Sequence, residues 1–485
     1  MKLSKLIEKL EYTVIQGDID THITELIYDS RKVVKDSVFV CISGSVRDAH
    51  DFVNEVVEKG AKVLVVEKMV EVPDDVVVLK VEDTRLALAL LSAAYFDYPA
   101  SKLKTIGVTG TKGKTTTTYM VRSILESAGI KTGLIGTIEA IIGEEIIPAS
   151  NTTPESYTLQ SYFAKMVEAG CEAVVMEVSS QGLMLHRVAG FVFDYGIFTN
   201  IEPDHIGPNE HKDFEDYMSC KGLLFKQCKV GIVNIDDEHT LDVIKGHTCK
   251  IETFGFSDKA DIRATDVQLL RKPGYLGVHY TVKGLLDFDV NIDIPGKFSV
   301  YNSLTTLAIC RHFNVDEEVI KKALDTVQVK GRVEIIPISD KFTLMIDYAH
   351  NAMSLKSLLT TLREYNPKRL VCLFGCGGNR SKLRRYEMGE ISGQYADLTV
   401  ATSDNPRDEE PQDILNDIKI GLAKTEGKYV EIIDRKEAIK YCIDHAEEGD
   451  VIILAGKGHE DYQEIKGKKY KMDERDLIQD ILAGK

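Results

Sequence analysis

The segment from residue 103 to residue 128 constrains the fold of this chain more than any other. Leu103-Lys-Thr-Ile-Gly-Val-Thr109 has the apolar pattern of a buried strand, and a glycine-rich turn follows it directly. Beyond the turn, apolar residues recur at the spacing of one helical face: Met120, Val121, Ile124, Leu125 and Ala128. A strand joined to a helix in this way predicts a mostly parallel sheet that is covered by helices on both faces.

The same alternation of strand and helix extends along most of the chain. One region differs, because between residues 261 and 295 apolar side chains occupy every second position, which predicts antiparallel strands. Elsewhere, buried-type strands are predicted at 38–42, 61–66, 173–178, 193–200, 344–347, 370–374, 398–402 and 451–455.

These patterns predict an α/β protein of three domains. A small N-terminal α/β domain is expected at residues 1–100, because Tyr98-Pro-Ala-Ser101 interrupts the preceding helical pattern. A central domain with a P-loop-type, mostly parallel sheet is expected at 101–330. A third α/β domain begins at Gly331 and is expected to span 331–485.

The composition argues against several other classes of protein. The 485 residues include 60 Lys and Arg against 76 Asp and Glu, and the net charge of −16 argues against coating nucleic acid or an anionic membrane. No apolar run approaches the roughly 18 residues of a membrane-spanning helix. The first ten residues predict an amphipathic helix and not a signal peptide. The nine cysteines contain no CxxC pair, which fits reduced thiols and predicts a cytoplasmic protein.

The turn after the first central strand has the features of a phosphate-binding loop. Phosphates require close backbone approach, inward N–H groups, a helix amino terminus and a lysine, and residues 107–116 supply all four. Lys114 is expected to contact the terminal phosphates, and Thr115 to bind magnesium. Five residues, and not the usual four, separate Gly107 from Gly113, so an ordinary glycine-rich turn is the alternative.

Two other strand ends carry candidate metal ligands. Glu177 ends a buried strand, where open α/β sheets bind ligands. Asp204 and His205 follow the next predicted strand and are expected near the same edge. Oxygen ligands with one nitrogen suit magnesium. Glu177 taken alone is more often structural, but its place beside the phosphate loop favours metal binding.

Lys221 falls on the apolar face of a predicted helix. It lies four residues after Tyr217 and seven after Phe214. The pattern alone favours a lysine whose aliphatic stem is buried and whose ammonium group reaches water.

Together, these segments resemble the Mur ligases, which are ATP-dependent, peptide-bond-forming enzymes of peptidoglycan precursor synthesis. The resemblance implies an N-terminal domain for the UDP end of one substrate, a central ATPase domain and a Rossmann-like C-terminal domain for the amino acid. It extends from about Ser30 to Glu460 and is carried by the phosphate loop, Glu177-Val-Ser-Ser180, Asp204-His205, Lys221, Gly331-Arg332-Val-Glu, Asp347-Tyr-Ala-His350-Asn and Gly456-Lys-Gly-His-Glu460.

Further segments narrow the resemblance to members that add the third amino acid: Asn151-Thr-Thr-Pro154, Phe374-Gly-Cys-Gly-Gly-Asn-Arg380 and Asp404-Asn-Pro-Arg407. The implied reaction activates the D-Glu carboxylate of UDP-MurNAc-L-Ala-D-Glu as an acyl phosphate, and the amine of meso-diaminopimelate then displaces phosphate. ATP and Mg²⁺ are the implied cofactors. The expected partners are these small molecules, with no nucleic acid and no membrane insertion, and the expected state is a monomer.

The resemblance also assigns roles residue by residue. The implied catalytic residues are Lys114, Glu177, His205 and Lys221, and the implied metal ligands are Thr115, Glu177, His205 and Lys221. The resemblance implies that Lys221 is N6-carboxylysine and helps a histidine to hold a second magnesium ion. The implied ATP contacts are Gly110, Thr111, Lys112, Gly113, Lys114, Thr115, Thr116, Asn302, Arg332, Asp347 and His350. The implied UDP-MurNAc-dipeptide contacts are Ser30, Asn151, Thr152, Thr153, Ser179 and Arg187. The implied diaminopimelate contacts are Arg380, Asp404, Asn405, Arg407, Gly456 and Glu460.

The choice of amino acid is expected to depend on Arg407. A guanidinium pairs in bidentate fashion with the second carboxylate of diaminopimelate, whereas lysine ends in an ammonium group of like charge. The alternative for Arg407 is a surface arginine in a polar loop.

Three other functions stay open at this point. The same scaffold is compatible with L-lysine or another diamino acid. A folylpolyglutamate synthetase shares the phosphate loop, but the Asp404–Arg407 segment and the Ser30 region argue against it. A non-catalytic nucleotide-binding protein is disfavoured because Lys114, Glu177, His205 and Lys221 occur together.

Overall fold

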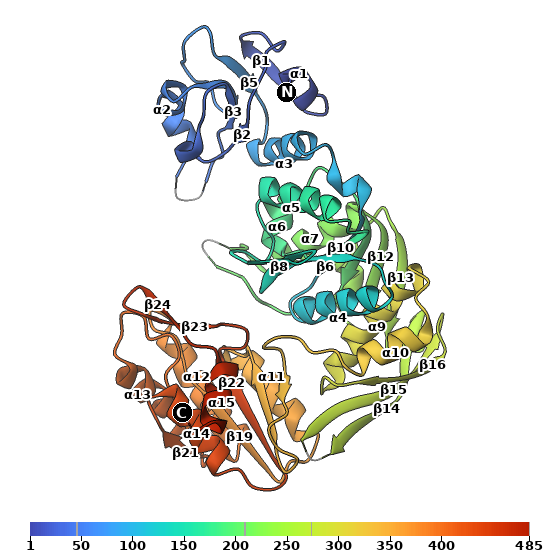
Figure 1. Ribbon diagram of the computed structural model, residues 1–485, viewed down its shortest axis with the longest axis vertical. Helices are drawn as coiled ribbons and strands as arrows, with labels where there is room; N and C mark the ends of the chain where they lie inside the picture. The colour runs from blue at the N-terminus through green and yellow to red at the C-terminus, as the bar shows by residue number, and fades with distance from the viewer. Residues whose placement is uncertain (45–46, 208–209, 273, 485) are drawn as a thin grey trace. The chain divides into compact units, whose positions relative to one another are not determined.

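The computed structural model describes residues 1–44, 47–207, 210–272 and 274–484 (Figure 1). The chain divides into two compact units, of which the first comprises Met1–Asp261 and Thr305–Val315 and the second comprises Ile262–Leu304 and Asp316–Lys485. Both units are mixed α/β structures, which confirms the predicted fold class. The boundaries of the three predicted domains stay a prediction.

The first unit begins with a five-stranded sheet. Its elements are α1 (Leu3–Leu6), β1 (Thr13–Gln16), β2 (Leu26–Ile27), β3 (Ser37–Val40), α2 (Val53–Glu58), β4 (Ala61–Val66), β5 (Val77–Lys80) and α3 (Thr84–Tyr95). The strand order is β1-β5-β4-β3-β2, with only β1 antiparallel to its neighbour. The helix α1 is shorter than the predicted ten residues, but Leu3, Leu6 and Ile7 are buried, as its pattern indicated.

A second, larger set of strands forms the rest of the first unit. Its elements are β6 (Lys104–Thr109), α4 (Lys114–Ser127), β7 (Thr132–Ile135), β8 (Glu139–Ile142), β9 (Glu145–Pro148), α5 (Ser156–Glu168), β10 (Ala173–Glu177), α6 (Ser180–Met184), β11 (Phe193–Phe198), α7 (Phe214–Gly222), β12 (Cys228–Asn234), α8 (Thr240–Val243) and β13 (Lys250–Gly255). The order is β13-β12-β11-β6-β10-β7-β8-β9, and the strands from β13 to β7 are parallel.

The centre of this sheet positions the candidate site. The strands β11, β6 and β10 are neighbours, and all three match predicted strands. Ile106, Val108 and Val175 in these strands are completely buried, as expected for a sheet with helices on both faces. Because parallel strands end at one edge, the phosphate loop, Glu177 and the segment after β11 meet there.

The second unit begins with the antiparallel strands predicted for residues 261–295. They are β14 (Ile262–Lys272), β15 (Tyr275–Gly284) and β16 (Phe288–Ile292). The helix α9 (Lys297–His312) belongs partly to each unit, and α10 (Glu317–Leu324) follows it.

The remainder of the second unit is a six-stranded sheet. Its elements are β17 (Glu334–Ile336), β18 (Thr343–Asp347), α11 (Ala352–Arg363), β19 (Arg369–Phe374), α12 (Lys382–Tyr395), β20 (Leu398–Ala401), α13 (Pro411–Leu422), β21 (Lys428–Glu431), α14 (Arg435–Asp444), β22 (Asp450–Ala455) and α15 (Glu474–Leu482), with the hairpin β23 (Tyr462–Ile465) and β24 (Lys468–Lys471) beside α15 in the sequence. The order is β17-β18-β22-β19-β20-β21, and only β17 is antiparallel.

Helices flank this C-terminal sheet (Figure 1). Side chains of α14 and α15, among them Ile439 and Ile478, pack on Leu344, Leu373 and Leu454 of the strands. Because β18, β22, β19 and β20 are parallel, their carboxyl ends lie at a common edge. The segment after β18 carries candidate nucleotide contacts, and those after β19, β20 and β22 carry the candidate amino-acid contacts.

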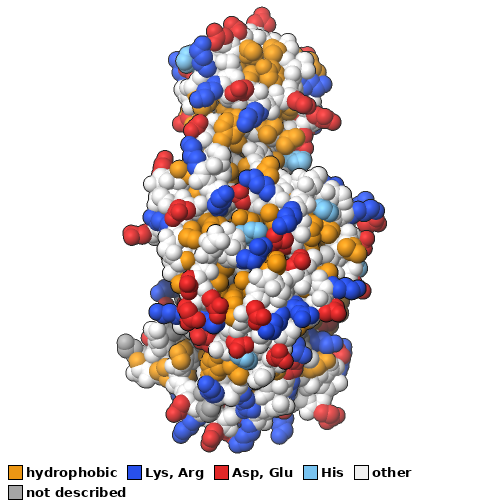
Figure 2. Space-filling model, turned by 90° about the vertical axis from the view of Figure 1, so that its right-hand side faces the viewer, with side chains coloured by type: hydrophobic (Ala, Val, Ile, Leu, Met, Phe, Trp, Pro, Cys, Tyr) orange, Lys and Arg blue, Asp and Glu red, His pale blue; other side chains and the backbone are white. Residues whose placement is uncertain are grey.

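Charged side chains of both signs are distributed over the visible surface (Figure 2). Figure 2 shows acidic and basic side chains interspersed over the face it presents. All nine cysteines are free and buried, as expected for reduced thiols. Within the described residues, no helix is long and apolar enough to cross a membrane.

A buried ion-pair cluster stabilises the second unit. Arg385 of α12 is 1% exposed and donates from Nη1 and Nη2 to the two carboxylate oxygens of Glu409, each at 2.8 Å. Its Nη1 also donates to Asp417 at 2.9 Å. The Arg385 hydrogen bonds lower the pKa of Glu409 from its usual 4.5 to about 2.

We expect Arg385→Met to lower the free energy of unfolding by about 3 kcal/mol, because it leaves the buried Asp417 and the half-buried Glu409 without their partner. The wild-type advantage is complete above about pH 4.5 and disappears as pH falls towards about 2, since protonated Glu409 no longer pairs with the guanidinium. Denaturant unfolding at several pH values measures this. Lys382→Met on the same helix is the control, because Lys382 is exposed and lies 3.5 Å from Asp417. Equal effects of the two variants would contradict the prediction.

Candidate active site

The end of β11 holds the loop between β6 and α4. The Lys112 amide donates to Asn200 Oδ1 at 2.9 Å, and Asn200 Nδ2 donates back to the Lys112 carbonyl at 3.0 Å. Thr199 Oγ1 donates to the same carbonyl at 2.7 Å. Gly110 has φ of +147°, and a Cβ there would lie 2.0 Å from Thr199 Oγ1, so this position requires glycine. The loop is thus rigidly attached to the neighbouring strand.

The loop ends at the amino terminus of α4. Gly113 precedes the helix with φ of +87°, and Thr115 and Thr116 lie in its first turn. Lys114 Nζ donates to the carbonyls of Gly110 at 2.8 Å and Thr111 at 3.1 Å. A helix amino terminus next to a lysine is suited to binding a phosphate anion.

Glu177 lies against the same helix end. Thr115 Oγ1 donates to Glu177 Oε1 at 3.0 Å, and the Thr137 amide donates to this oxygen at 2.8 Å. Thr137 Oγ1 donates to Glu177 Oε2 at 3.0 Å. A Cβ at Gly136 would lie 2.5 Å from Glu177 Oε1, so a larger residue there would displace this carboxylate. The predicted ligands Thr115 and Glu177 are therefore adjacent, and both offer oxygen atoms.

Lys221 lies inside the protein next to the phosphate loop. It is 1% exposed, its Nζ donates to the Gly110 carbonyl at 3.0 Å, and this nitrogen is 4.4 Å from the centre of the Tyr217 ring. Burial, with a further contribution from the positive charge of Lys114, holds the pKa of Lys221 well below its usual range. The side chain therefore tends towards the neutral amine. The interpretation of Lys221 as a lysine that reaches water is wrong.

His205 also lies near Tyr217. Its side chain is 55% exposed, its φ is +54°, and its Nδ1 is 3.0 Å from Glu210 Oε1. The rings of His205 and Tyr217 are 6.1 Å apart, and the Tyr217 hydroxyl is 3.1 Å from Thr111 Oγ1. The fold thus gathers His205 and Lys221 around Tyr217 beside the loop.

The donor set fits a magnesium ion. A threonine hydroxyl and a glutamate carboxylate are hard oxygen ligands of the kind that magnesium prefers. An amine is a poor ligand for this ion, but a carbamate on Lys221 would supply two more oxygens. Thr115 and Glu177 are thus chemically consistent with one magnesium site, and His205 with a carboxylated Lys221 would be consistent with the second that the resemblance implies.

The predicted dipeptide contacts share a network with Glu177. Thr153 Oγ1 donates to the Glu177 carbonyl at 3.0 Å and accepts from the Ser179 amide at 3.0 Å. Arg187 Nη1 donates to the Thr153 carbonyl at 3.1 Å. Thr152 Oγ1 is 3.0 Å from Thr137 Oγ1. These residues therefore lie beside the carboxyl end of β10.

Two predicted substrate contacts lie outside this network. Asn151 lines a cavity of about 130 Å³ that Gly136 and Glu155 also line. Ser30 begins a short turn of residues 30–32, and its carbonyl accepts from Lys59 at 3.0 Å.

The second unit gathers several of the other predicted nucleotide contacts. Asp347 accepts from the amides of Val333 and Ala349, each at 2.8 Å, and burial raises its pKa. The Arg332 guanidinium lies 4.8 Å from the centre of the Tyr348 ring. The ring of the exposed His350 lies 4.6 Å from that of Tyr348. Arg332, Asp347 and His350 thus form one cluster.

Asn302 is placed separately. It is buried in α9.

A second cluster follows β20 and β22. Asn405 Nδ2 donates to Glu460 Oε2 at 3.0 Å, and Lys457 Nζ donates to Asn405 Oδ1 and to Glu460 Oε2, each at 2.9 Å. Asp404 Oδ1 lies 3.6 Å from Lys457 Nζ. Gly456 faces the same place, since a Cβ on it would lie 3.1 Å from Asp404 Oδ2. Carboxylates, an amide and an ammonium group are therefore concentrated within a few ångströms.

Arg407 lies at the border of this cluster. Its Nε donates to Glu464 Oε2 at 3.1 Å, and its Nη1 donates to the Gly378 carbonyl at 2.8 Å. Its φ is +53°, and its backbone pairs with residues 464–466 of β23 and the turn beyond it. Arg407 is thus a fixed, half-buried guanidinium and not a mobile surface side chain. Arg380, in contrast, is exposed in the loop after β19.

Several positioning residues were not predicted from the sequence. Asn200 and Thr137 hold the phosphate loop and Glu177, and Glu464 holds Arg407. A weak indication in the sequence exists for two such residues. Asn200 ends a predicted strand, and Lys457 lies within the segment 456–460 that carries part of the family resemblance. Thr137 and Glu464 had none, because nothing in their local pattern shows what they contact.

The chain is similar to known proteins over nearly its whole length. Residues 108–310 match the Mur ligase middle domain, and residues 331–458 match the family described as Mur ligase, glutamate ligase domain. A Clostridium acetobutylicum protein named UDP-N-acetylmuramoyl-L-alanyl-D-glutamate–2,6-diaminopimelate ligase 1 is 44% identical over 485 residues, covering 99% of each chain. A Clostridium perfringens protein named as the same type of ligase is 41% identical over 492 residues, covering 100% of each.

A solved structure is also similar over the full length. It is titled as a UDP-N-acetylmuramoyl-L-alanyl-D-glutamate–2,6-diaminopimelate ligase, with 26% identity and a TM-score of 0.74, covering 100% of this chain and 99% of its own.

Proposed function

Because the chain belongs to the Mur ligase family, we propose that it is the ATP-dependent ligase that adds meso-2,6-diaminopimelate to UDP-N-acetylmuramoyl-L-alanyl-D-glutamate. The observation that carries this proposal is the likeness over the whole length to relatives named for that reaction. The cluster of Asp404, Asn405, Arg407 and Glu460 supports it independently, because it offers groups for both ends of a diamino dicarboxylic acid.

The proposed reaction has two steps. A carboxylate oxygen of the terminal D-Glu attacks the γ-phosphorus of ATP, and ADP leaves. The amine of diaminopimelate then attacks the acyl carbon and loses a proton, and inorganic phosphate leaves with the electron pair of the broken C–O bond. The product is the amide, with ADP and phosphate.

The residues around the phosphate loop would stabilise the charges of this reaction. Lys114 and the amino terminus of α4 bind the phosphates that carry the developing negative charge. Thr115, Glu177, His205 and a carboxylated Lys221 would hold magnesium, which neutralises phosphate charge when bound. Thr137 keeps the Glu177 carboxylate in place by two hydrogen bonds.

The environment of Lys221 supports its modification. A neutral amine can attack the carbon of CO₂, and loss of one proton then gives the anionic carbamate. Burial keeps Lys221 close to that neutral form. The carbamate also supplies a negative charge beside Lys114, where the unmodified side chain places a second amine.

The position of Arg407 supports diaminopimelate as the amino acid. Its guanidinium is fixed by Glu464 and Gly378, so it presents a rigid fork to a carboxylate. The second carboxylate of diaminopimelate satisfies that fork, and L-lysine has no such group. Glu460 and Asp404 offer negative charge to the ammonium groups of the amino acid.

The test is phosphate release from ATP and Mg²⁺ with UDP-MurNAc-L-Ala-D-Glu, comparing meso-diaminopimelate with L-lysine. We expect strong preference for diaminopimelate, with the tripeptide product identified by mass spectrometry. Arg407→Met is expected to lower kcat/KM for diaminopimelate by about 100-fold, because one ligand carboxylate loses its partner. The KM for the UDP-linked substrate should stay the same.

The matched control is Lys424→Met, which removes a cation that pairs with Glu390 on the same unit. It should leave the preference unchanged. Preference of the wild type for L-lysine would leave the proposed ligase activity standing but refute the role of Arg407 in selecting the amino acid. Absence of turnover with either amino acid would refute the proposed substrates.

A further inference from the structure

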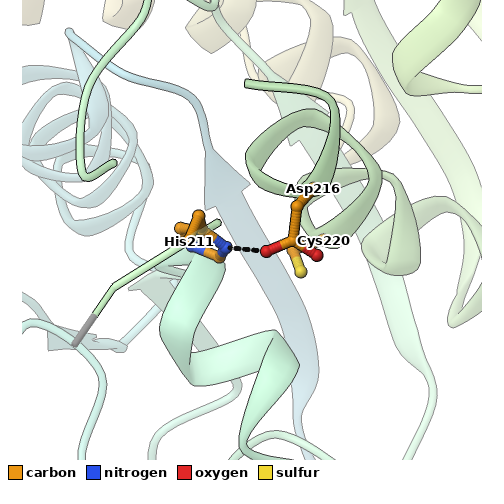
Figure 3. Close-up of side chains that lie close together, drawn as sticks. All are labelled: His211, Asp216 and Cys220. Carbon is orange, nitrogen blue, oxygen red and sulfur yellow. Dashed lines mark hydrogen bonds and ion pairs between the residues drawn. The ribbon is translucent and has the colours of Figure 1, made fainter. Parts of the chain in front are cut away.

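A buried histidine that the proposed reaction does not use connects α6 with the segment before α7. His211 is 0% exposed, and its Nε2 lies 2.8 Å from the hydroxyl of Ser180, the first residue of α6. Its Nδ1 lies 3.1 Å from Asp216 Oδ2 in the first turn of α7 (Figure 3). Three side chains from separate segments thus form one continuous hydrogen-bonded chain.

The carboxylate sets the orientation of the imidazole. Asp216 only accepts, so Nδ1 of a neutral His211 donates to it and leaves Nε2 as the acceptor for the Ser180 hydroxyl. The Asp216 amide in turn donates to Asp213 Oδ1 at 2.8 Å, which caps α7. The position of His211 is therefore determined from both sides.

The hydrogen-bonded series of Ser180, His211 and Asp216 lies next to residues that have proposed roles in substrate binding and in metal binding. Ser180 follows Ser179, whose hydroxyl accepts from the Gly182 amide at 3.0 Å and whose amide donates to Thr153. On the other side, the His211 amide donates to the His205 carbonyl at 3.0 Å. His211 is thus the link between a proposed substrate contact and a proposed metal ligand.

We propose that His211, oriented by Asp216, is a positioning residue that locks α6 to the segment carrying His205. This fixes the substrate-binding end of α6 relative to the metal ligands, and the inference rests on the proposed function. Serine, histidine and aspartate in this order also occur in nucleophilic triads, but Ser180 is 3% exposed and its hydroxyl is used by His211, so it is closed to a substrate.

A metal ion is the competing explanation of the same cluster. His211, Asp216 and Cys220 each place one ligand atom within 4.8 Å of the others (Figure 3). A thiolate, an imidazole and a carboxylate would suit a borderline-soft ion such as Zn²⁺ or Co²⁺. The positioning role instead predicts that Cys220 is dispensable and that Ser180 is required.

The experiment compares His211→Ala, Asp216→Ala, Asp216→Asn and Ser180→Ala. We expect His211→Ala to lower kcat/KM for the UDP-linked dipeptide by about 10- to 100-fold, as for other residues that orient ligands of a metal site. The KM for diaminopimelate should stay unchanged. Asp216→Asn retains an acceptor oxygen and should recover most of the activity lost in Asp216→Ala. The double variant Ser180→Ala/His211→Ala should have the same kcat/KM as His211→Ala, because each single substitution already breaks the same hydrogen bond between the two residues.

Hydrogen exchange gives a readout that needs no substrate. Amides of α6 should exchange about tenfold faster in His211→Ala, which is the effect of losing one hydrogen bond. His312→Ala is the matched control, since His312 Nε2 lies 2.9 Å from Glu252 Oε2 in the same unit, away from α6. It should change neither α6 exchange nor the KM values.

The outcomes separate the two proposals. Faster α6 exchange without any ligase turnover would refute the proposed function but leave the structural link standing. Unchanged α6 exchange, or KM values that rise equally for all substrates, would overturn the positioning role. A thiolate-to-cobalt absorption band in the wild type that Cys220→Ser abolishes would replace it with a metal site.

Discussion

Lys221→Ala is expected to lower kcat by about 10³-fold or more, the scale seen when a group that stabilises transition-state charge is lost. Lys221 lies buried against Gly110 and Tyr217, so alanine leaves no group in its place that carries oxygen atoms to the metal site. The rate of ADP and phosphate formation under saturating substrates measures this. If the active form is the carbamate, a small carboxylate such as formate should restore part of the activity.

The control for Lys221 is Lys226→Ala. Lys226 is an exposed lysine a few residues later, and its removal should leave kcat unchanged. Isotopically labelled bicarbonate should give a carbamate signal in the carbon NMR spectrum of the wild type that is missing from Lys221→Ala. Activity close to that of the wild type in Lys221→Ala would show that this side chain is not part of the active site. Loss of activity without a carbamate signal in the wild type would refute the modification alone.

Lys114→Ala is expected to have the second large effect. It should lower kcat/KM for ATP by about 10²- to 10³-fold, because the terminal phosphates lose a cation at the point where negative charge develops. The dissociation constant of ADP, measured by calorimetry, should rise as well. The loop itself should stay folded, since Asn200 and Thr199 hold it through the carbonyl and amide of Lys112.

The control for Lys114 is Lys229→Ala. Lys229 pairs with Asp194 at 2.8 Å near the start of β12, at the opposite ends of the strands from the phosphate loop. Both variants remove one positive charge from the first unit, so a general effect of charge would appear in both. Equal loss of ADP affinity in the two variants would contradict a specific phosphate contact by Lys114.

Much of the first unit's site was predictable because its parts are local in the sequence. Residues 103–128 contain the strand, the turn and the helix in order, and the structure has them as β6, the phosphate loop and α4. Glu177 was expected at the end of a buried strand and lies there. Since β6 and β10 pair in parallel, their carboxyl ends lie side by side, and Thr115 Oγ1 is 3.0 Å from Glu177 Oε1.

Other parts were not predictable from local patterns. The periodicity around Lys221 correctly placed it on an apolar face, but it indicated a side chain that extends to water. The structure instead buries the amine against Gly110, which lies 111 positions earlier in the chain. Whether a lysine reaches water depends on what covers the helix, and this covering comes from a distant segment.

Local sequence patterns were sufficient to establish the order of strands and helices, the phosphate loop and the residue types available for catalysis. These depend on short-range properties: apolar periodicity, the backbone freedom of glycine and the chemistry of each side chain. The partner of each side chain, in contrast, is known only from the folded structure. Thr137 on Glu177, Glu464 on Arg407 and Ser180 on His211 are contacts between segments that are far apart in the chain. Chain folding brings such pairs together, so their hydrogen bonds leave no periodic trace in the sequence.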